Sequence, residues 1–366
     1  MKDKKSSSFF KRIITTLLCI VLALVLVISG YVAYLFIDYD RIEDNQTLTI
    51  NDNTDTKVPT GKNLKALSYN IGFCAYTQDF SFFMDGGTES RAKSEESVNE
   101  VLDGIKNLLF DEDADFVLLE EVDENADRSH HVDQKGFFVD SLPQYDNLFA
   151  VNYDSSYLFY PILNPIGKSL SGIQTFSKYD IESSTRRSLM IEDSIMKFFD
   201  LDRCYSVSRL KTDNDKELVL YTVHLSAYTS DGTIATKQLE MLVSDMKAEY
   251  EKGNYVLCGG DFNKDLLQDS GEIFGVSGED DTWAQAFPLD LLKDTGLSLV
   301  APYSEKTHAA SCRNTDEVYK EEGQFNVTLD GFIVSDNITV SDSDVINVKF
   351  LYSDHNPVFV NFTLEK

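Results

Sequence analysis

The stretch Val256-Leu-Cys-Gly-Gly-Asp-Phe-Asn-Lys-Asp265 joins a short apolar run to a glycine pair, followed by a carboxylate and an amide two residues apart. Residues 254–258 predict a buried strand, and the glycine pair predicts a sharp turn at its end. Asp261 and Asn263 would then lie at the end of a strand, where side chains from a rigid sheet converge into a crevice. An ordinary polar turn has the same composition, so the rest of the chain must distinguish the two.

A strand and a helix precede this stretch. Residues 218–225 form an apolar run of strand length with His224 near its end, and residues 233–250 carry apolar side chains at helical spacing. Strand, helix and strand in that order predict an α/β domain. A lone histidine on an apolar strand is usually a buried structural residue, so His224 gains significance only from its neighbours.

A second unit of strand, helix and strand lies between residues 64 and 122. Its first strand ends in Asn70, its helix has Ser94 as a candidate N-cap, and its second strand ends in Glu120 and Glu121. Because adjacent residues of a strand point to opposite faces, only one of the two glutamates can enter a common site.

The C-terminal part adds further polar residues next to predicted strands. Asp330 lies near the start of one apolar run, and Asp354 and His355 come just before the last. The loop-rich residues 269–326 between these regions contain the single tryptophan, Trp283, which we expect to shape the rim of a site.

The composition describes a folded and strongly acidic protein of 366 residues. Hydrophobic residues make up 42% of the chain and aromatic residues 12%, which excludes general disorder. The formal charge of −28 disfavours broad capture of nucleic acid or of anionic lipid, although a local cation could still hold one phosphate group. The five cysteines show no paired spacing, which favours small buried side chains over disulfides.

The N-terminus predicts a membrane anchor. Residues 1–12 form a basic tail, and residues 13–37 contain no charged side chain and are long enough to cross a bilayer as a helix. The length and the absence of a small-residue cleavage site favour a retained signal anchor over a cleaved leader. The basic flank predicts a cytoplasmic tail, a polar extracytoplasmic stalk at 38–62 and a catalytic domain at 63–366, giving a single-pass protein of the cell membrane.

The residue types at the strand ends suit phosphoryl chemistry. Of the five histidines, His224 and His355 lie at strand ends, whereas His130, His131 and His308 have loop-like surroundings and receive no role. Carboxylate and amide oxygens without thiolates favour Mg²⁺, with Mn²⁺ as a substitute, over structural zinc. A cation, a base and neutral donors are what hydrolysis of a phosphate ester requires. The oxygen donors are Asn70, Glu120 or Glu121, Asp261, Asn263, Asp330 and Asp354.

From about Leu64 to the C-terminus, the chain resembles the endonuclease/exonuclease/phosphatase superfamily, also called deoxyribonuclease-I-like. The resemblance implies a four-layer sandwich of two mixed β-sheets flanked by helices, and a divalent-metal phosphodiesterase or phosphomonoesterase. It rests on six segments in the family's order: Ser-Tyr-Asn70, Leu-Leu-Glu120-Glu121, Gly172 to Ile181, Val-His224-Leu, Gly-Gly-Asp261-Phe-Asn263, and Asp330 with Ser-Asp354-His355-Asn-Pro-Val.

The resemblance also implies a metal site. Glu121 would be the principal ligand, with Asn70 and Asp354 close by. The chain departs from the family at two positions. Glu120 stands where the family usually has glutamine, and Gly331 stands where an aromatic residue is common, which predicts a looser floor beside the catalytic histidine.

Five residues would do the chemistry if the resemblance holds. Asp261 would orient or activate the attacking water, and Asn263 and His224 would bind the scissile phosphate. His355 would be the general base or the transition-state partner, oriented by Asp330. Asp261 and His355 are treated as one coupled pair, because members of the family differ in the formal base.

Three functions remain open from the sequence. The first is an anchored extracytoplasmic phosphoesterase that acts on a small or lipid-linked substrate. The second is a surface nuclease, which would need a basic groove. The third is a binding module without activity, disfavoured because every catalytic residue type is present. The oligomeric state is not indicated. The candidates for a basic groove are Lys178, Arg186, Arg187 and Arg203.

Overall fold

The computed structural model describes residues 2–192, 194–198, 200–227, 233–275 and 284–366. The chain divides into two compact units, Met1–Arg41 and Ile42–Lys366, and the second is called the domain below. The first unit contains α1 (Lys2–Asp38), which is long and apolar enough over Phe9–Asp38 to cross a membrane. Its length and composition support a membrane-spanning helix.

One seven-stranded mixed sheet holds the first predicted strand–helix–strand unit. Its strand order is β15-β16-β3-β4-β6-β5-β2, and β3 and β4 are its parallel pair. The other pairs in this sheet are antiparallel. The strands are β2 (Ile50–Asn51), β3 (Asn63–Asn70), β4 (Phe116–Ala126), β5 (Asp146–Asp154), β6 (Ser169–Ser177), β15 (Ile338–Val345) and β16 (Val358–Leu364).

A second seven-stranded mixed sheet holds the other unit. Its order is β1-β7-β8-β9-β10-β14-β11, with β9 and β10 parallel. A short ribbon of β12 (Cys312–Arg313) and β13 (Asn326–Val327) lies outside both sheets. The strands of the second sheet are β1 (Gln46–Thr47), β7 (Ser183–Ser188), β8 (Cys204–Lys211), β9 (Glu217–His224), β10 (Tyr255–Asp261), β11 (Leu297–Val300) and β14 (Asp330–Ser335).

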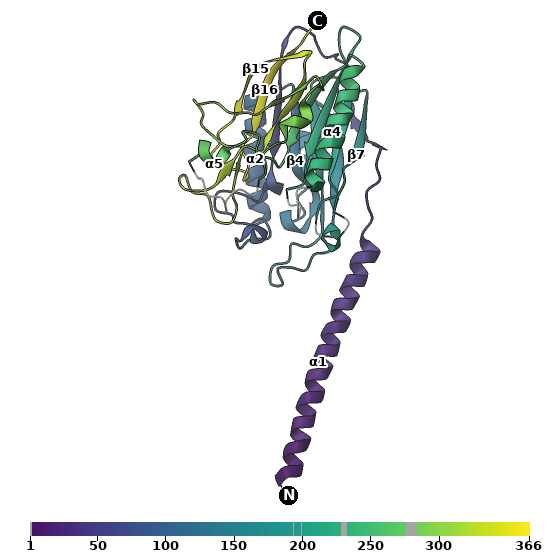
Figure 1. Cartoon of the computed structure of the whole chain (residues 1–366), viewed down its shortest axis with the longest axis vertical. Coiled ribbons are helices and arrows are strands. Elements are labelled where there is room, and N and C mark those ends of the chain that lie inside the picture. The colour runs from purple at the N-terminus through teal and green to yellow at the C-terminus, as the bar shows by residue number, and fades with distance from the viewer. Residues whose placement is uncertain (1, 193, 199, 228–232, 276–283) are drawn as a thin grey trace. The chain divides into compact units, whose positions relative to one another are not determined.

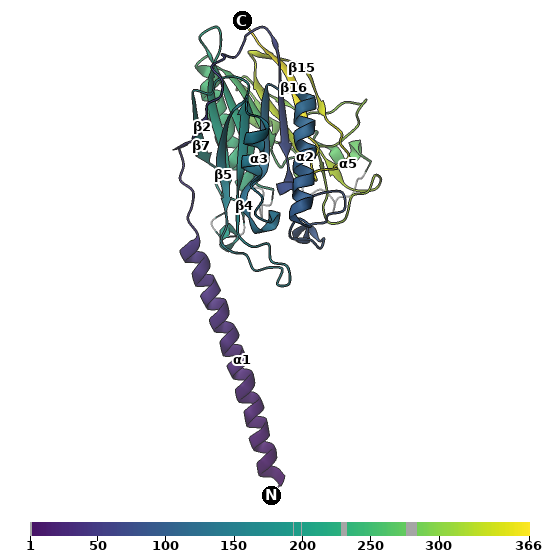
Figure 2. The same cartoon turned by 180° about the vertical axis from the view of Figure 1, so that it is seen from behind.

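The helices complete four layers and confirm the predicted fold class. Helix α4 covers one sheet in Figure 1, and α2 and α3 cover the other in Figure 2. Ser94 caps α2 as predicted, because its side chain accepts the N–H of Ser97. The helices are α2 (Glu95–Glu112), α3 (Gln134–Ser141), α4 (Thr233–Glu251) and α5 (Ser270–Ile273), with short 3₁₀ turns η1 (Gly72–Cys74), η2 (Phe83–Asp85), η3 (Asp127–Ser129), η4 (Ile195–Phe198) and η5 (Leu289–Leu292).

Alternation along the strands decides which residues lie between the sheets. The even-numbered side chains of β3, of β9 and of β4 as far as Glu120 face the inter-sheet core, and the odd-numbered ones of β3 and of the same part of β4 pack against α2 and α3. Each buried leucine of this core contributes about 1.5–3 kcal/mol. The four cysteines of the domain are buried with free thiols, as predicted. Inter-sheet residues include Leu64, Ala66, Phe116, Leu118, Leu218, Leu220, Leu257 and Phe332.

The glycine pair does not form the predicted turn. Strand β10 continues through Gly259 and Gly260 to Asp261. A Cβ on Gly260 would lie 1.9 Å from the carbonyl oxygen of Val223, and a Cβ on Gly259 would lie 2.7 Å from Leu118 of the facing sheet. The glycines are therefore required by close approach inside the sandwich, and the turn comes after Asp261.

Most of the predicted stalk is bound to the domain. Strand β1 pairs with β7 and β2 pairs with β5, so both sheets receive an edge strand from this segment. The backbone N–H of Ile42 donates to Asp202 at 3.2 Å. Because β1 and β2 pair with the edges of the two sheets, the segment outside the domain is much shorter than residues 38–62.

Candidate active site

The site lies where the two parallel strand pairs end. Asn70 and Glu120 are register partners on β3 and β4, and His224 and Asp261 are register partners on β9 and β10. Asp330, at the start of β14, pairs with Asp261. All five belong to the alternating sets that face the opposite sheet. The two sheets thus bring polar side chains from both halves of the chain into one buried cluster.

Asp261 is the centre of this cluster. Its Oδ2 accepts a hydrogen bond from Nδ2 of Asn70 at 3.1 Å and lies 3.6 Å from Nε2 of His224 and 3.9 Å from Nε2 of His355. Burial and the neighbouring carboxylate of Asp330 raise the pKa of Asp261 to about 7. A carboxylate in this setting can exchange a proton near neutral pH.

The two imidazoles are held in opposite states. Nδ1 of His355 lies 2.7 Å from Oδ2 of Asp330, and although burial opposes it, that carboxylate raises the pKa of His355 well above its ordinary value. Burial, followed by the charges of Arg203 and His355, lowers the pKa of His224 well below its ordinary value. His355 is therefore suited to carry a positive charge, and His224 to remain a neutral donor or acceptor.

Asn263 forms the turn that follows β10. Its φ of 49° is left-handed, and its backbone N–H donates to Oδ1 of Asp261 at 2.8 Å. Its side-chain Nδ2 donates to the carbonyl of Leu225 at 2.8 Å. Because an amide nitrogen carries two hydrogens, one remains for a further acceptor while the other fixes the turn beside the end of β9.

Glu121 departs from the strand alternation. Its φ of 56° lies within a bulge of β4, which re-aims the side chain relative to a regular strand. Burial is the largest cause that raises the pKa of Asp354, to about 6, and Glu121 is among the charges that add to it. The hydroxyl of Ser353 donates to Asp354 at 3.2 Å and to the carbonyl of Asn70 at 2.8 Å, which places Asp354 beside the end of β3.

The donor set fits a hard divalent cation. Glu121, Asp354 and Asn70 supply carboxylate and amide oxygens, and the charge of Glu121 adds to burial in raising the pKa of Asp354. His355 takes part in two groups of close ligand atoms, one with Cys312 and Asp354 and one with two aspartates. Sulfur and imidazole are softer ligands, whereas the predicted ligands provide oxygen alone.

Glu120 takes the family's glutamine position as a neutral acid. It is fully buried, and its Oε1 accepts the hydroxyl of Ser68 at 3.1 Å. Its Oε2 has no hydrogen-bond partner among the described residues. Burial, then Asp330 and Asp261, raise the pKa of Glu120 well above its ordinary value. A protonated carboxyl has the shape of an amide, so Glu120 can occupy a position where the family usually has glutamine.

The predicted looseness beside Gly331 is wrong. A Cβ at this position would lie 2.5 Å from Cδ1 of Leu266 and 2.9 Å from the carbonyl of Val300. The space that an aromatic residue would take is therefore already filled from neighbouring segments. Trp283, expected at the rim, lies outside the described residues.

Two arginines flank the site, and the sequence analysis did not give them a role there. Arg128 forms a two-point ion pair with Asp123 at 2.8 and 3.2 Å, and its guanidinium lies 3.9 Å from the ring of Phe73. Arg203 donates to the carbonyl of Leu225 at 2.9 Å. Both lower the pKa of His224. Neither arginine shows a periodic pattern or a motif, so the sequence held no signal for them.

The four basic residues considered for a nucleic-acid groove do not gather. Arg186 is buried and donates to the carbonyls of Val151 and Asp202, and Arg187 pairs with Asp44 and Asp245. Lys178 binds Asp113, beside the end of α2, and only Arg203 of the four lies next to the catalytic strand ends. These contacts are structural hydrogen bonds and ion pairs, and they form no continuous basic surface among the described residues.

Comparison with known proteins gives the family. The model of the Endonuclease/Exonuclease/phosphatase family matches residues 67–355. The chain belongs to this family. The match begins in β3 and ends at His355, so it spans every residue of the cluster described above. The predicted family is confirmed, and its members are hydrolases that act on phosphate esters.

Solved structures show the same fold at low identity. An endonuclease/exonuclease/phosphatase from Beutenbergia cavernae is similar with a TM-score of 0.59 and 16% identity, over 83% of this chain and 72% of that one. ANGEL2, a 2',3'-cyclic phosphatase solved with adenosine-2',3'-vanadate, gives 0.54 and 16%, over 89% and 100%. A family member from Bacteroides vulgatus gives 0.52 and 16%, over 83% and 100%. A search of curated protein sequences finds no match.

Proposed function

We propose that this protein is a membrane-anchored, extracytoplasmic, divalent-metal-dependent phosphoesterase that hydrolyses a phosphodiester or phosphomonoester by in-line attack of water. The observation that carries the proposal is the cluster at Asp261, whose Oδ2 has Asn70, His224 and His355 within 3.1 to 3.9 Å. Membership of the family supplies the class of reaction.

Asp261 and His355 would divide the proton transfers. With a pKa of about 7, Asp261 can accept a proton from the attacking water near neutral pH. His355, held by Asp330 in a form that retains its proton, would stabilise the negative charge that develops on the phosphoryl oxygens. The two side chains lie 3.9 Å apart, so their protons are coupled.

His224 and Asn263 would hold the phosphate. The neutral imidazole of His224 and the second amide hydrogen of Asn263 are donors that need no charge of their own. Burial, with the charges of Arg203, His355 and Arg128, lowers the pKa of His224 and favours its neutral form. Neutral donors orient the ester without holding the product phosphate too strongly.

Glu121, Asn70 and Asp354 would hold the cation, with Mg²⁺ as the expected ion and Mn²⁺ as a substitute. When bound, the cation neutralises charge on the phosphate ester as the reaction proceeds. Asn70 connects this group to Asp261, because its side-chain nitrogen donates to that carboxylate. The hydroxyl of Ser353 lies within hydrogen-bond distance of both the backbone carbonyl of Asn70 and the carboxylate of Asp354.

The anchor and the charge favour a substrate at the membrane. Helix α1 provides the apolar span, and the basic residues before it favour a cytoplasmic tail with the domain outside. The net charge of −28 disfavours polyanions such as DNA and RNA. A small or lipid-linked phosphate ester is therefore the proposed class of substrate.

A substrate panel on the purified chain tests the proposal. It contains a generic aryl phosphodiester, DNA, RNA, nucleotides, sphingomyelin and phosphoinositides, each with Mg²⁺ and with EDTA. We expect Mg²⁺-dependent release from the aryl or lipid substrates, lost in Asp261→Ala and His355→Ala. Turnover of DNA alone would make the protein a nuclease. No turnover with Mg²⁺ or Mn²⁺ would leave a binding module.

A further inference from the structure

Exposed apolar side chains gather on a few loops of the domain. Among its described residues, the five most exposed large hydrophobic side chains are called the apolar rim here. They come from the loop after β3, the loop after β5 and the segment after β7. Their exposed fractions are 55% for Met84, 61% for Tyr160, 75% for Ile162, 100% for Leu163 and 58% for Ile195.

These loops lie at the catalytic end of the sheets. The first follows Asn70 directly. Strand β5 is antiparallel to β6, which is antiparallel to β4, so the loop after β5 lies at the end where β4 brings Glu120. Strand β7 runs parallel to β9 through β8, so the segment after β7 lies at the end of His224. The apolar rim therefore lies at the same end of the domain as the candidate active site.

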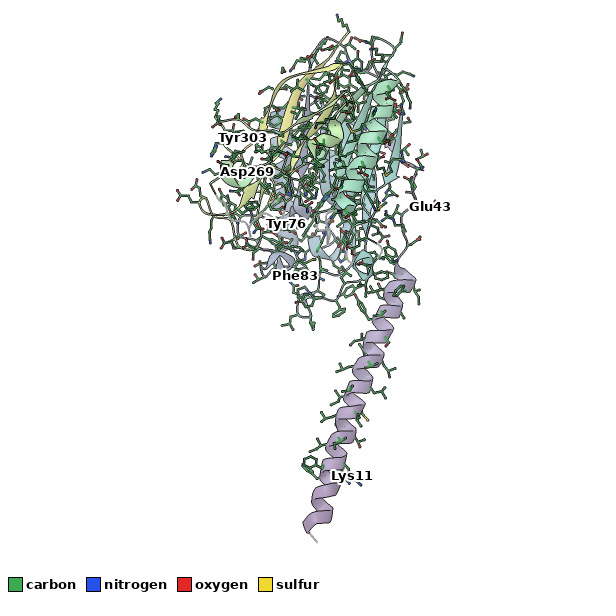
Figure 3. All side chains as sticks on the ribbon, in the orientation of Figure 1. Lys11, Glu43, Tyr76, Phe83, Asp269 and Tyr303 are labelled. Carbon is green, nitrogen blue, oxygen red and sulfur yellow. The ribbon has the colours of Figure 1, made fainter. Side chains whose placement is uncertain are left out.

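The loop after β5 is held in place by several contacts. Leu158 and Gly167 exchange two backbone hydrogen bonds at its base. The hydroxyl of Ser90 donates to the carbonyl of Asn164 at 2.5 Å, which joins it to the loop after β3. The rings of Phe83 and Tyr160 join the same two loops at 5.7 Å, and Figure 3 shows Phe83 at the edge of the domain, farther out than Tyr76. These contacts hold the base of the loop that carries Ile162 and Leu163 in one position.

The polypeptide from α1 enters the domain at this same end. The backbone N–H of Ile42 donates to Asp202, and its carbonyl accepts the hydroxyl of Ser188, the last residue of β7. Three residues separate Asp38, the end of α1, from Ile42, so the chain between them spans at most about 14 Å. A short segment therefore connects the apolar helix to the catalytic end of the domain.

We propose that the apolar rim docks on the lipid bilayer that holds α1, inserting Ile162 and Leu163 at the level of the head groups, and that the active site takes a phosphate ester of a lipid in that bilayer. This inference rests on the proposed function and deepens its substrate class. Exposed apolar side chains at the end of the domain that carries the candidate active site indicate an interaction surface, and the short connection makes the bilayer the nearest apolar phase.

The charge of the protein decides how the docking works. With a net charge of −28, the chain is repelled by anionic lipid, so the contact must depend on apolar insertion and favour a zwitterionic surface. Docking by apolar insertion differs from electrostatic adhesion, which would be stronger on acidic lipid.

The test places a fluorophore at the tip of the full chain in phosphatidylcholine vesicles. Cys19→Ser removes the exposed cysteine, and the cysteines of the domain are buried. Leu163→Cys is then labelled with an environment-sensitive dye and quenched by lipids with doxyl groups on their acyl chains. Phe110→Cys is the matched control, because Phe110 is 48% exposed and lies in the last turn of α2, at the opposite end of the domain. We expect strong quenching at 163 and little at 110.

Three results would overturn the docking. The first is equal quenching at positions 163 and 110, and the second is stronger quenching at 163 when phosphatidylglycerol is added. The third is loss of the signal when the protein is diluted in lipid, which would identify a second copy of the chain as the occupant of the apolar rim. Quenching at 163 in a chain that hydrolyses no phosphate ester would support docking and reject the proposed function.

Activity gives the second arm of the test. The pair Ile162→Glu and Leu163→Glu should lower hydrolysis of a phosphodiester lipid in vesicles by about tenfold or more, because charged side chains cannot enter the apolar layer. Hydrolysis of a soluble aryl phosphodiester should stay unchanged. Equal loss on both substrates would contradict a role in docking.

Discussion

Two acidic clusters lie at opposite ends of the same domain, and they differ in what binds their oxygens. Asp52, Asp146 and Asp180 form one, and Asp261, Asp330 and His355 form the other. Asp146 accepts three backbone N–H groups at 2.6 to 2.9 Å. Asp330 has an oxygen without a partner among the described residues, although it is fully buried. Proximity of acids alone thus does not mark a site, and an unsatisfied buried oxygen distinguishes the second cluster from the first.

The largest expected effect separates the two clusters by activity. Asp261→Asn should lower kcat/KM on an aryl phosphodiester by ~10³-fold, because the proton acceptor is lost. Asp146→Asn should leave kcat/KM unchanged but lower the free energy of unfolding by about 2 kcal/mol, because its oxygens hold backbone donors. Steady-state kinetics and denaturant unfolding measure both. Loss of activity in a folded Asp146→Asn protein would refute the distinction.

Asp330→Asn should have the next largest effect, acting through His355. A neutral amide no longer raises the pKa of the imidazole, so His355 should lose its proton at lower pH. We expect kcat to fall by ~10²-fold with little change in KM, and the alkaline limb of the pH profile to move to lower pH. Asp180→Asn, in the other cluster, is the control and should leave the profile in place. An unshifted profile in Asp330→Asn would show that Asp330 does not control the protonation of His355.

The positions of the proposed site residues were predictable because strand periodicity is a strong signal. Apolar runs ending in Asn70, Glu120, His224 and Asp261 place one polar residue at the end of each parallel strand. Parallel pairs joined by helices bring those ends to the same edge. The four layers follow from the same alternation, since each strand presents one face to a helix and the other to a sheet.

Features that depend on contacts distant in sequence were not predictable. The glycine pair was interpreted as a turn because the carbonyl of Val223 and the side chain of Leu118 are invisible in the local sequence. Residues 42–62 looked like a polar stalk because a strand at a sheet edge needs no apolar pattern when its backbone supplies the bonds. The bulge at Glu121 has no local signature either.

The bulge at Glu121 allows a test of which of the two adjacent glutamates is the metal ligand. Glu121→Gln should raise the Mg²⁺ concentration for half-maximal activity by ~10- to 100-fold, because a proposed ligand loses its charge. Glu120→Gln should change it by no more than about twofold, because a buried neutral acid is replaced by an amide of the same shape. A Mg²⁺ titration of activity measures both. The reverse order would make Glu120 the ligand.

The smallest effect concerns stability without metal. The pKa of Asp261 is raised to about 7 from 3.8, so the folded protein binds this proton more tightly than the unfolded chain. The resulting stabilisation is complete below pH 3.8 and is lost as the pH rises through about 7. Between pH 6 and 8 in EDTA, the carboxyl should lower the free energy of unfolding by about 1.4 kcal/mol. His224 acts in the opposite direction, because its pKa is lowered and the unfolded chain takes up its proton below 6.5.

Comparing variants isolates the contribution of Asp261 from that of His224. Denaturant unfolding in EDTA at pH 6, 7 and 8 should show a steeper loss of stability in the wild-type protein than in Asp261→Asn, which keeps His224 but cannot ionise at 261. Asp146→Asn should be less stable at every pH yet keep the wild-type slope. If the wild-type protein and Asp261→Asn share one slope, the carboxyl at 261 is ionised in the metal-free fold. The two acidic clusters would then differ in hydrogen bonding alone.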